Sequence, residues 1–319
     1  MAINWFPGHM NKAKKQIQEA MPDIDLVVEV LDARIPYSST NPLVNQLRDQ
    51  KPCIKVLNKA DLADPAMTKR WIEHYEQQDN TKAISLVAED RKQTKQLINL
   101  IKRIGANKIT QKKSIRVMIM GIPNVGKSTL INALAGRYIA NTGNEPAVTK
   151  RQQMIDLKNG VILADTPGIL WPKFENPKSG YRLAVTGAVK DTAMEYEDVA
   201  LFAISFLREL YPEEFSTRFK LKTLEGTDDD LLDTVATKRG CLRSGGIRDL
   251  HKASEVILHE LRSGKIGQLT LETPEMAEEE EALRIQLLKE RIEQEKAEKE
   301  ARKPQRQAQQ AHPRTDEPD

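Results

Sequence analysis

The chain has little cysteine and no long apolar run. Cys53 and Cys241 are the only two cysteines in its 319 residues, and they lie far apart without the short spacing of zinc ligands. Neither a disulfide framework nor a zinc site is therefore expected, and both are predicted to be free thiols. No apolar run approaches the roughly 20 residues of a membrane span, and the start of the chain lacks the apolar centre of a signal peptide. We expect a cytoplasmic protein without membrane contacts.

Charge of one sign does not dominate, since the net charge is only +3. Glu275–Asp319 carries nine Lys or Arg and thirteen Asp or Glu, a balance of −4, so the preceding residues carry +7. A basic body permits nucleic-acid binding without demonstrating it, because excess Lys and Arg also keeps proteins soluble. With 39% hydrophobic and 30% charged residues, the chain has the composition of a folded protein of about two domains.

An apolar run followed by a glycine-rich turn is the most specific feature of the sequence. Ile115–Met120 is typical of a strand, Gly121–Thr129 fits the pattern G-x-x-x-x-G-K-[ST], and an apolar helical run follows. In this pattern the loop N–H groups surround phosphates, Lys127 reaches the outer phosphates and the Ser128 hydroxyl binds Mg²⁺. The predicted phosphate-binding residues here are Gly121, Pro123, Asn124, Val125, Gly126, Lys127, Ser128 and Thr129.

A second motif, Asp-Thr-Pro-Gly at 165–168, follows a predicted hairpin of Gln152–Leu157 and Gly160–Asp165 with an Asn-Gly turn. At the end of that strand the Asp165 carboxylate can reach the Mg²⁺ shell through water, and the Gly168 N–H can sense a γ-phosphate. A plain Asp-x-Pro-Gly turn is common. Its place after a phosphate-binding loop favours the nucleotide role.

A third motif, Asn58–Asp61 (Asn-Lys-Ala-Asp), directly follows the predicted strand Cys53–Leu57. Asp61 can accept the N1–H and N2–H of guanine, which selects GTP over ATP because adenine would leave the carboxylate unpaired. Asn58 would brace the loop and Lys59 would cover the face of the base. The tetrapeptide also occurs by chance in surface loops. It indicates guanine binding here because a phosphate-binding loop is present in the same chain.

The order of these motifs indicates a circular permutation. Ordinary GTPases place Asn-Lys-x-Asp last, whereas here it precedes the phosphate-binding loop by about sixty residues. Chain termini usually lie near one another, so joining the old ends through a polar connector at 105–114 leaves the sheet intact. In the permuted order, the segment after Asp165 leads directly into the region that is predicted to be helical.

The remaining patterns predict the fold class. Apolar strands alternate with amphipathic helices up to about residue 165, which is typical of an α/β protein with a parallel sheet. From Tyr181 to about Gly264 only helical periodicity remains. We expect a doubly wound, mostly parallel P-loop GTPase sheet followed by a small all-α domain. The predicted parts are a GTPase domain at 1–178, a helical domain at 179–273 and a charged tail at 274–319 that is partly helical and partly disordered. The predicted strands are Asp25–Asp32, Cys53–Leu57 and Ala83–Val87, and the predicted helices are Asn11–Met21, Pro65–Gln77 and Thr94–Ile104.

Taken together and in this order, the motifs resemble the circularly permuted GTPases of the ribosome-assembly type. The resemblance spans about residues 1–273 and includes Trp5–Met10, Asp32–Pro36, Arg239-Gly240 and Gly245-Gly246. It implies GTP hydrolysis, with Mg²⁺ as cofactor, coupled to late maturation of the large (50S) ribosomal subunit. It also implies contact with the subunit precursor and its rRNA, release on hydrolysis, and a monomer away from the ribosome.

The resemblance assigns further residues. Thr149 matches the switch threonine that closes onto Mg²⁺ and the γ-phosphate, although Ala147 stands where the family usually has glycine. Ser85 matches the start of the last guanine-contacting loop, but Ser85–Val87 departs from the familiar Ser-Ala-Lys, so an ordinary strand end is the alternative. Asn124 stands where cation-dependent relatives ligate K⁺, and the alternative is an asparagine that braces the loop.

The residue that positions the attacking water is not evident from the motifs. Ile169 follows Gly168 where many regulatory GTPases place a glutamine, and an apolar side chain cannot orient water. The resemblance offers His9 as the catalytic alternative. Docking or packing beside Trp5 and Phe6 is the other interpretation of His9.

Two rival functions are open. One, from another class, is an RNA-binding scaffold in which the nucleotide is only structural, and the second is a GTPase that serves RNA modification or membrane-linked signalling rather than subunit assembly. Neither an appended catalytic motif nor a membrane-binding stretch is visible in the sequence. The candidate RNA contacts, for which a solvated helix face is the alternative, are Arg239, Arg243, Arg248, His251 and Lys252.

Overall fold

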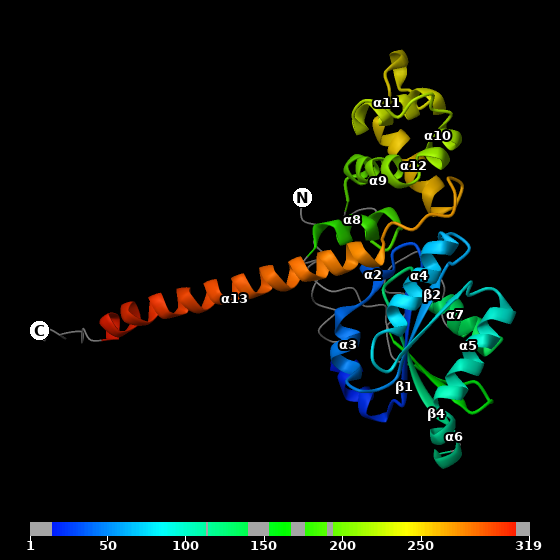
Figure 1. Cartoon of the computed structure of the whole chain (residues 1–319), viewed down its shortest axis with the longest axis vertical. Coiled ribbons are helices and arrows are strands. Elements are labelled where there is room, and N and C mark those ends of the chain that lie inside the picture. The colour runs from blue at the N-terminus through cyan, green and yellow to red at the C-terminus, as the bar shows by residue number, and fades with distance from the viewer. Residues whose placement is uncertain (1–14, 113, 140–152, 167–175, 190–193, 311–319) are drawn as a thin grey trace, which may run out of the picture. The chain divides into compact units, whose positions relative to one another are not determined.

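The computed structural model describes residues 15–112, 114–139, 153–166, 176–189 and 194–310 (Figure 1). The chain forms two compact units, Met1–Pro274 and Glu275–Asp319. The second unit is built on the helix α13 (Pro274–Gln310), which bears out the helical part of the expected tail. None of the helices that the structure describes is both long and apolar enough to cross a bilayer.

A six-stranded sheet with the order β3-β2-β1-β4-β6-β5 forms the centre of the first unit. Four of its neighbouring pairs are parallel, and only β5 with β6 is antiparallel. This confirms the doubly wound, mostly parallel sheet and the expected hairpin. The strands are β1 (Leu26–Asp32), β2 (Cys53–Asn58), β3 (Thr81–Leu86), β4 (Ile115–Gly121), β5 (Gln153–Asp156) and β6 (Val161–Asp165).

Helices cover both faces of this sheet, which explains why β1 and β2 are buried along their whole length. In Figure 1 the strands lie between α3 on one side and α5 with α7 on the other. Val44 of α3 packs in a buried cluster with Met118 and Met120 of β4, while Leu97 of α5 and Leu130 of α7 are also fully buried. The helices are α2 (Pro36–Ser39), α3 (Pro42–Arg48), α4 (Pro65–Glu76), α5 (Arg91–Ile104), α6 (Ala106–Lys112) and α7 (Lys127–Ala135), with a 3-10 turn η1 at Met21–Asp23.

Aspartates fix the starts of two of these helices. Asp64 accepts the N–H groups of Ala66 and Met67 at 2.8 and 3.1 Å, and Asp90 caps α5 in the same way. The polar connector expected at 105–114 is largely helical, because α6 occupies most of it. After Gly105 the segment contains neither glycine nor proline, and the bond from Ile109 N–H to Gly105 O at 2.9 Å starts a new helical turn.

The region after the hairpin is helical, as its periodicity predicts. The helix α11 begins with a capping box between Thr227 and Asp230, and Phe215 and Phe219 of α10 are buried in the core of this region. The boundary expected at 178/179 stays a prediction, since this region belongs to the same compact unit as the sheet. The helices are α8 (Pro177–Val185), α9 (Tyr196–Leu210), α10 (Pro212–Phe219), α11 (Asp228–Arg239) and α12 (Leu250–Arg262), with a short turn η3 at Ser244–Gly246.

Candidate functional site

The glycine-rich turn lies at the carboxyl end of the sheet, between β4 and α7. At Gly121 a Cβ atom would come within 2.8 Å of Val30 O on the neighbouring strand, and at Gly126 it would come within 2.2 Å of Asn58 Nδ2. Gly126 also has a φ of +91°, a conformation that L side chains rarely adopt. Glycine is therefore required at both places, and the turn directs the N-terminus of α7 toward the end of the sheet, where an anion can bind.

Lys127 and Asp165 meet at this end of the sheet. Because β4 and β6 are parallel with Ile119 opposite Asp165, the carboxylate lies beside the first turn of α7. Lys127 Nζ donates to Asp165 Oδ1, and both side chains are buried. Burial lowers the pKa of Lys127, and the Asp165 carboxylate works in the opposite direction. The pair places one positive and one negative group where a phosphate and its counter-ion would bind.

The same place suits a magnesium ion. The Ser128 residue at the start of α7 and the Asp165 carboxylate supply oxygen donors, which hard divalent cations prefer. Among the residues that the structure describes, no three His, Cys, Asp or Glu side chains gather into a metal cluster. Two protein oxygens suit Mg²⁺, which usually keeps several waters and is completed by the phosphates of the nucleotide.

Asn58 joins the phosphate-binding loop to the loops that follow β2 and β3. Its Nδ2 donates to Val125 O at 2.8 Å, and its Oδ1 accepts the Ala88 N–H at 3.0 Å. The Asn58 residue is only 2% exposed. Two motifs separated by about sixty residues in the sequence are thereby held together, with Asn58 in the bracing position that the sequence predicts.

Lys59 makes a contact that the sequence does not predict. Its Nζ donates to Asn124 O in the phosphate-binding loop at 2.8 Å and to Asp32 Oδ2 at 2.9 Å. Asp61 is exposed nearby, and Ser85 lies half-buried on β3, opposite Leu57. Guanine recognition by these residues stays a prediction, since their placement agrees with it without testing it.

Asp32 and Arg34 are buried charged residues beside this site. The sequence singled them out only as part of the resemblance, with no chemical role. Asp32 Oδ1 accepts from Arg34 Nε at 2.9 Å, and Asp32 Oδ2 accepts from Arg34 Nη2 at 2.7 Å. Two opposite charges two positions apart at the end of an apolar strand are the signal that points to them, because such charges are rarely buried unless paired.

Asn124 is tied to the helical region. Its Nδ2 donates to Gly187 O, just after α8, at 2.9 Å, which agrees with the bracing alternative and leaves K⁺ binding a prediction. Three further predicted site residues, His9, Thr149 and Gly168, lie outside the described residues, as do Ile169 and Ala147.

Arg239, one of the candidate RNA contacts, is engaged within the helical core. Its Nη2 donates to Glu260 Oε2 at 2.7 Å, and its guanidinium lies 4.8 Å from the centre of the Phe219 ring. Arg218 donates to the same carboxylate at 2.7 Å. These contacts give Arg239 a role in holding α10, α11 and α12 together.

The other four candidate RNA contacts lie where α11 connects to α12, and each has an acidic neighbour. A short hairpin with a bridge between Leu242 and Arg248 lies here, and Leu242 and Ile247 are exposed on it. Exposed ion pairs of this kind contribute little to stability, so a phosphate can compete for the basic partner. The ion pairs are Arg243 with Asp249 at 3.0 Å, Arg248 with Asp233 at 3.1 Å and Lys252 with Glu255 at 2.8 Å, and His251 Nε2 lies 3.7 Å from a carboxylate oxygen of Glu255.

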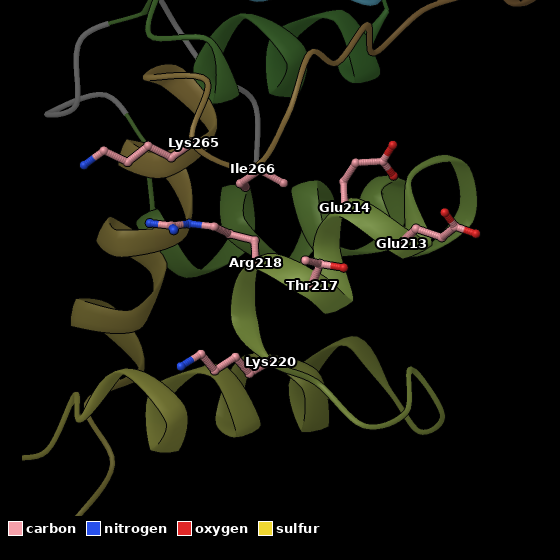
Figure 2. Close-up of a pocket in the computed structure, with 7 residues that line it drawn as sticks. All are labelled: Glu213, Glu214, Thr217, Arg218, Lys220, Lys265 and Ile266. Carbon is pink, nitrogen blue, oxygen red and sulfur yellow. The ribbon is translucent and has the colours of Figure 1, made fainter.

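An open hollow of about 510 Å³ lies in the helical region, away from the phosphate-binding loop. Figure 2 shows acidic side chains on one side of it and basic side chains on the other. Charges of both signs spread over an open surface do not define a class of ligand. The lining residues are Glu213, Glu214, Thr217, Arg218, Lys220, Lys265 and Ile266.

Two protein-family models match this chain, one over the sheet and one from the phosphate-binding loop into the helical region. A family model described as RsgA GTPase matches residues 11–175, and one described as 50S ribosome-binding GTPase matches residues 116–238. Ribosome biogenesis GTPase A of Priestia megaterium is 45% identical over 287 residues, which cover 88% of this chain and 99% of that protein. The protein of the same name from Thermotoga maritima is 33% identical, over 86% of this chain and 95% of its own length.

A comparison with solved structures indicates the same family as the sequence comparisons. The solved structure of GNP-bound YlqF from T. maritima matches with a TM-score of 0.59 and 30% sequence identity, over 83% of this chain and 99% of that one. The likeness therefore extends from the sheet through the helical region, beyond the phosphate-binding loop that many unrelated nucleotide-binding proteins share. The buried ties between Asn-Lys-Ala-Asp and the phosphate-binding loop accordingly belong to a GTPase whose motifs run in permuted order, and the chain is a member of the ribosome biogenesis GTPase A family.

Proposed function

We propose that this GTPase acts in the cytoplasm during late maturation of the large (50S) ribosomal subunit. In its GTP-bound form it binds the subunit precursor and its rRNA, and hydrolysis releases it as a monomer. The observation that carries the proposal is the bond from Asn58 Nδ2 to Val125 O at 2.8 Å, which makes the base-recognition and phosphate-binding loops one site. The names of the relatives supply the ribosomal context.

Within this site, Asp61 selects guanine and Lys127 binds the outer phosphates. Ser128 and Thr149 would hold Mg²⁺ directly and Asp165 through water, and the ion would withdraw charge from the phosphates. The Gly168 N–H would contact the γ-phosphate. Lys127 must give up its contact with Asp165 to bind phosphate oxygens. Because the two groups are neighbours at the same site, a small movement of the Lys127 side chain is enough.

K⁺ and His9 are proposed as the sources of activation. Asn124 stands at the phosphate-binding loop with a φ of +59°, where a monovalent cation would add positive charge in place of an arginine finger. His9 would orient the attacking water once a ribosomal particle is bound, because Ile169 cannot. Replacing His9 with Ala should lower the stimulated rate and leave GTP affinity nearly intact.

RNA contact is proposed for Arg243, Arg248, His251 and Lys252. Arg243, Arg248 and Lys252 form exposed ion pairs, so each of these cations can exchange its carboxylate for an RNA phosphate at small cost. Arg239 is better described as structural because of its bonds to Glu260. The predicted salt dependence is that binding weakens steeply as the salt concentration rises.

The experiment is the GTP hydrolysis rate of the full chain with and without large-subunit particles, in K⁺ and in Na⁺ at matched ionic strength. We expect slow intrinsic turnover that rises strongly with the particles and rises further in K⁺. Small-subunit particles at the same RNA concentration are the control. If large-subunit particles leave the hydrolysis rate unchanged, the proposed coupling to the ribosome is wrong. If the rates in K⁺ and Na⁺ are equal, the proposed role of Asn124 in binding K⁺ is wrong.

A further inference from the structure

The carbonyl end of α8 is held by side-chain donors. Arg262, at the end of α12, donates from Nη2 to Ala184 O at 2.8 Å and from Nε to Val185 O at 3.0 Å. A positive group at this place also interacts favourably with the negative end of the helix dipole. These two bonds come from within the helical region.

The next two carbonyls are held from the nucleotide-binding side. Thr186 O accepts from Arg34 Nη2 at 3.5 Å, and Gly187 O accepts from Asn124 Nδ2 at 2.9 Å. Arg34 Nη1 also donates to the Arg262 carbonyl at 3.4 Å. The ends of α8 and α12 are therefore attached to Arg34, two residues after the end of β1, and to the phosphate-binding loop.

One carboxylate connects these attachments to the predicted guanine site. Asp32 is 3% exposed and binds two cations, Arg34 through both carboxylate oxygens and Lys59 at 2.9 Å. Lys59 in turn donates to Asn124 O at 2.8 Å. Burial alone would raise the pKa of Asp32, but Arg34 and Lys59 hold it well below its usual value, so the carboxylate is charged at neutral pH.

We propose that Asp32 is a positioning residue for guanine-nucleotide binding: it fixes Lys59 against the phosphate-binding loop and, through Arg34, couples that loop to the carbonyl end of α8. The inference rests on the proposed assignment of Asn58–Asp61 to the guanine base. A nucleotide that contacts Lys59 and the loop changes the same groups that hold the carbonyls of Thr186 and Gly187. Nucleotide binding is thereby transmitted to the helical region through buried charges.

The coupling is tested by hydrogen exchange of the full chain with and without saturating GDP. GDP should slow amide exchange at 121–129 and at 184–189 in the wild type. Arg34→Lys keeps the positive charge beside Asp32 but loses the two-pronged geometry, so it should keep the response at 121–129 and reduce it at 184–189, where the bond from Asn124 to Gly187 O remains. A response at 184–189 that is as large in Arg34→Lys as in the wild type, or that is absent from the wild type, would overturn the coupling.

Arg218→Lys is the matched control for this variant. Arg218 forms the same kind of two-pronged pair, with Glu260, through Nε at 3.0 Å and Nη2 at 2.7 Å, but in the helical region away from the nucleotide. Its response to GDP at 184–189 should equal that of the wild type. Loss of the response in both variants would show a general loosening of the fold and overturn the specific role of Arg34.

The positioning role of Asp32 is tested by GDP affinity, from titration with a fluorescent GDP. Asp32→Asn should weaken binding about tenfold or more, because a charge-assisted bond to Lys59 is lost. If this variant does not fold, Asp32→Glu takes its place, since the longer side chain cannot hold both cations in the same geometry. Unchanged affinity in the folded variant would overturn the role.

Asp61→Asn separates the two hypotheses. If Asp61→Asn weakens GDP binding while Asp32→Asn does not, the guanine assignment stands and the positioning role is wrong. If Asp61→Asn leaves the GDP affinity unchanged, the guanine assignment is wrong. The positioning role of Asp32, which rests on that assignment, is then wrong as well.

Discussion

Asn58 offers the sharpest test of how the site is built. Replacing Asn58 with Ala removes the donor to Val125 O at 2.8 Å and the acceptor of the Ala88 N–H at 3.0 Å. Both backbone groups belong to buried residues, and each unpaired buried group costs about 1 to 3 kcal/mol. We therefore expect the free energy of unfolding to fall by about 2 to 6 kcal/mol. GDP affinity should fall at least tenfold, or about 1.4 kcal/mol, because the two loops lose their tie.

The assay is urea unfolding followed by circular dichroism, combined with titration of fluorescent GDP under conditions in which the variant is fully folded. Asn159→Ala is the control, because Asn159 Oδ1 accepts a part-buried bond from Val161 N–H at 3.2 Å within the hairpin turn and joins no distant loops. That control should lose at most about 1 kcal/mol and bind GDP normally. An Asn58→Ala variant that binds GDP like the control would refute the argument that Asn58 unites the two loops.

Three further predictions concern buried charges and base recognition. Lys55→Met should lower the free energy of unfolding by about 3 to 5 kcal/mol in urea titrations, because it leaves the fully buried Glu29 without its partner at 2.7 Å, and adding Glu29→Gln should restore most of the loss. The lowered pKa of Asp32 means that its contribution to stability is complete above the unfolded value near 3.9 and is lost as pH falls toward its folded pKa. The stability difference between wild type and Asp32→Asn should thus be constant from about pH 7 to 5 and shrink below about pH 4, and a difference that grows in acid would contradict this sign. Asp61→Asn should weaken GTP binding at least tenfold in equilibrium titrations, whereas tight binding by this variant would rule out its role in guanine recognition.

Much of the fold follows from local patterns in the sequence. Nearly continuous apolar runs such as Asp25–Asp32 predict strands buried on both faces, and the glycine pattern at Gly121–Thr129 predicts the turn between β4 and α7. The Asn-Gly turn predicts the hairpin of β5 and β6. These elements depend on residues that are near one another in the chain, which is why the sequence alone suffices.

Contacts between distant residues could not be predicted in the same way. Glu272 lies 234 positions from Ser38 in the sequence, yet its buried carboxylate accepts the Ser38 N–H at 3.0 Å and the Tyr37 N–H at 2.7 Å. The roles of Lys59 and Arg34 likewise depend on partners that the fold brings together. Short elements such as α2 and α3 were also missed, because four to seven residues give too little periodicity to reveal a helix.

We propose that the bound nucleotide decides whether this GTPase binds the large ribosomal subunit. The most direct measurement is co-sedimentation of the full chain with separated ribosomal particles, in a non-hydrolysable GTP analogue and in GDP at the same salt concentration. We predict that the protein sediments with immature large-subunit particles in the analogue and stays in the supernatant in GDP. Equal sedimentation in both nucleotides, or binding to small-subunit particles instead, would contradict the account.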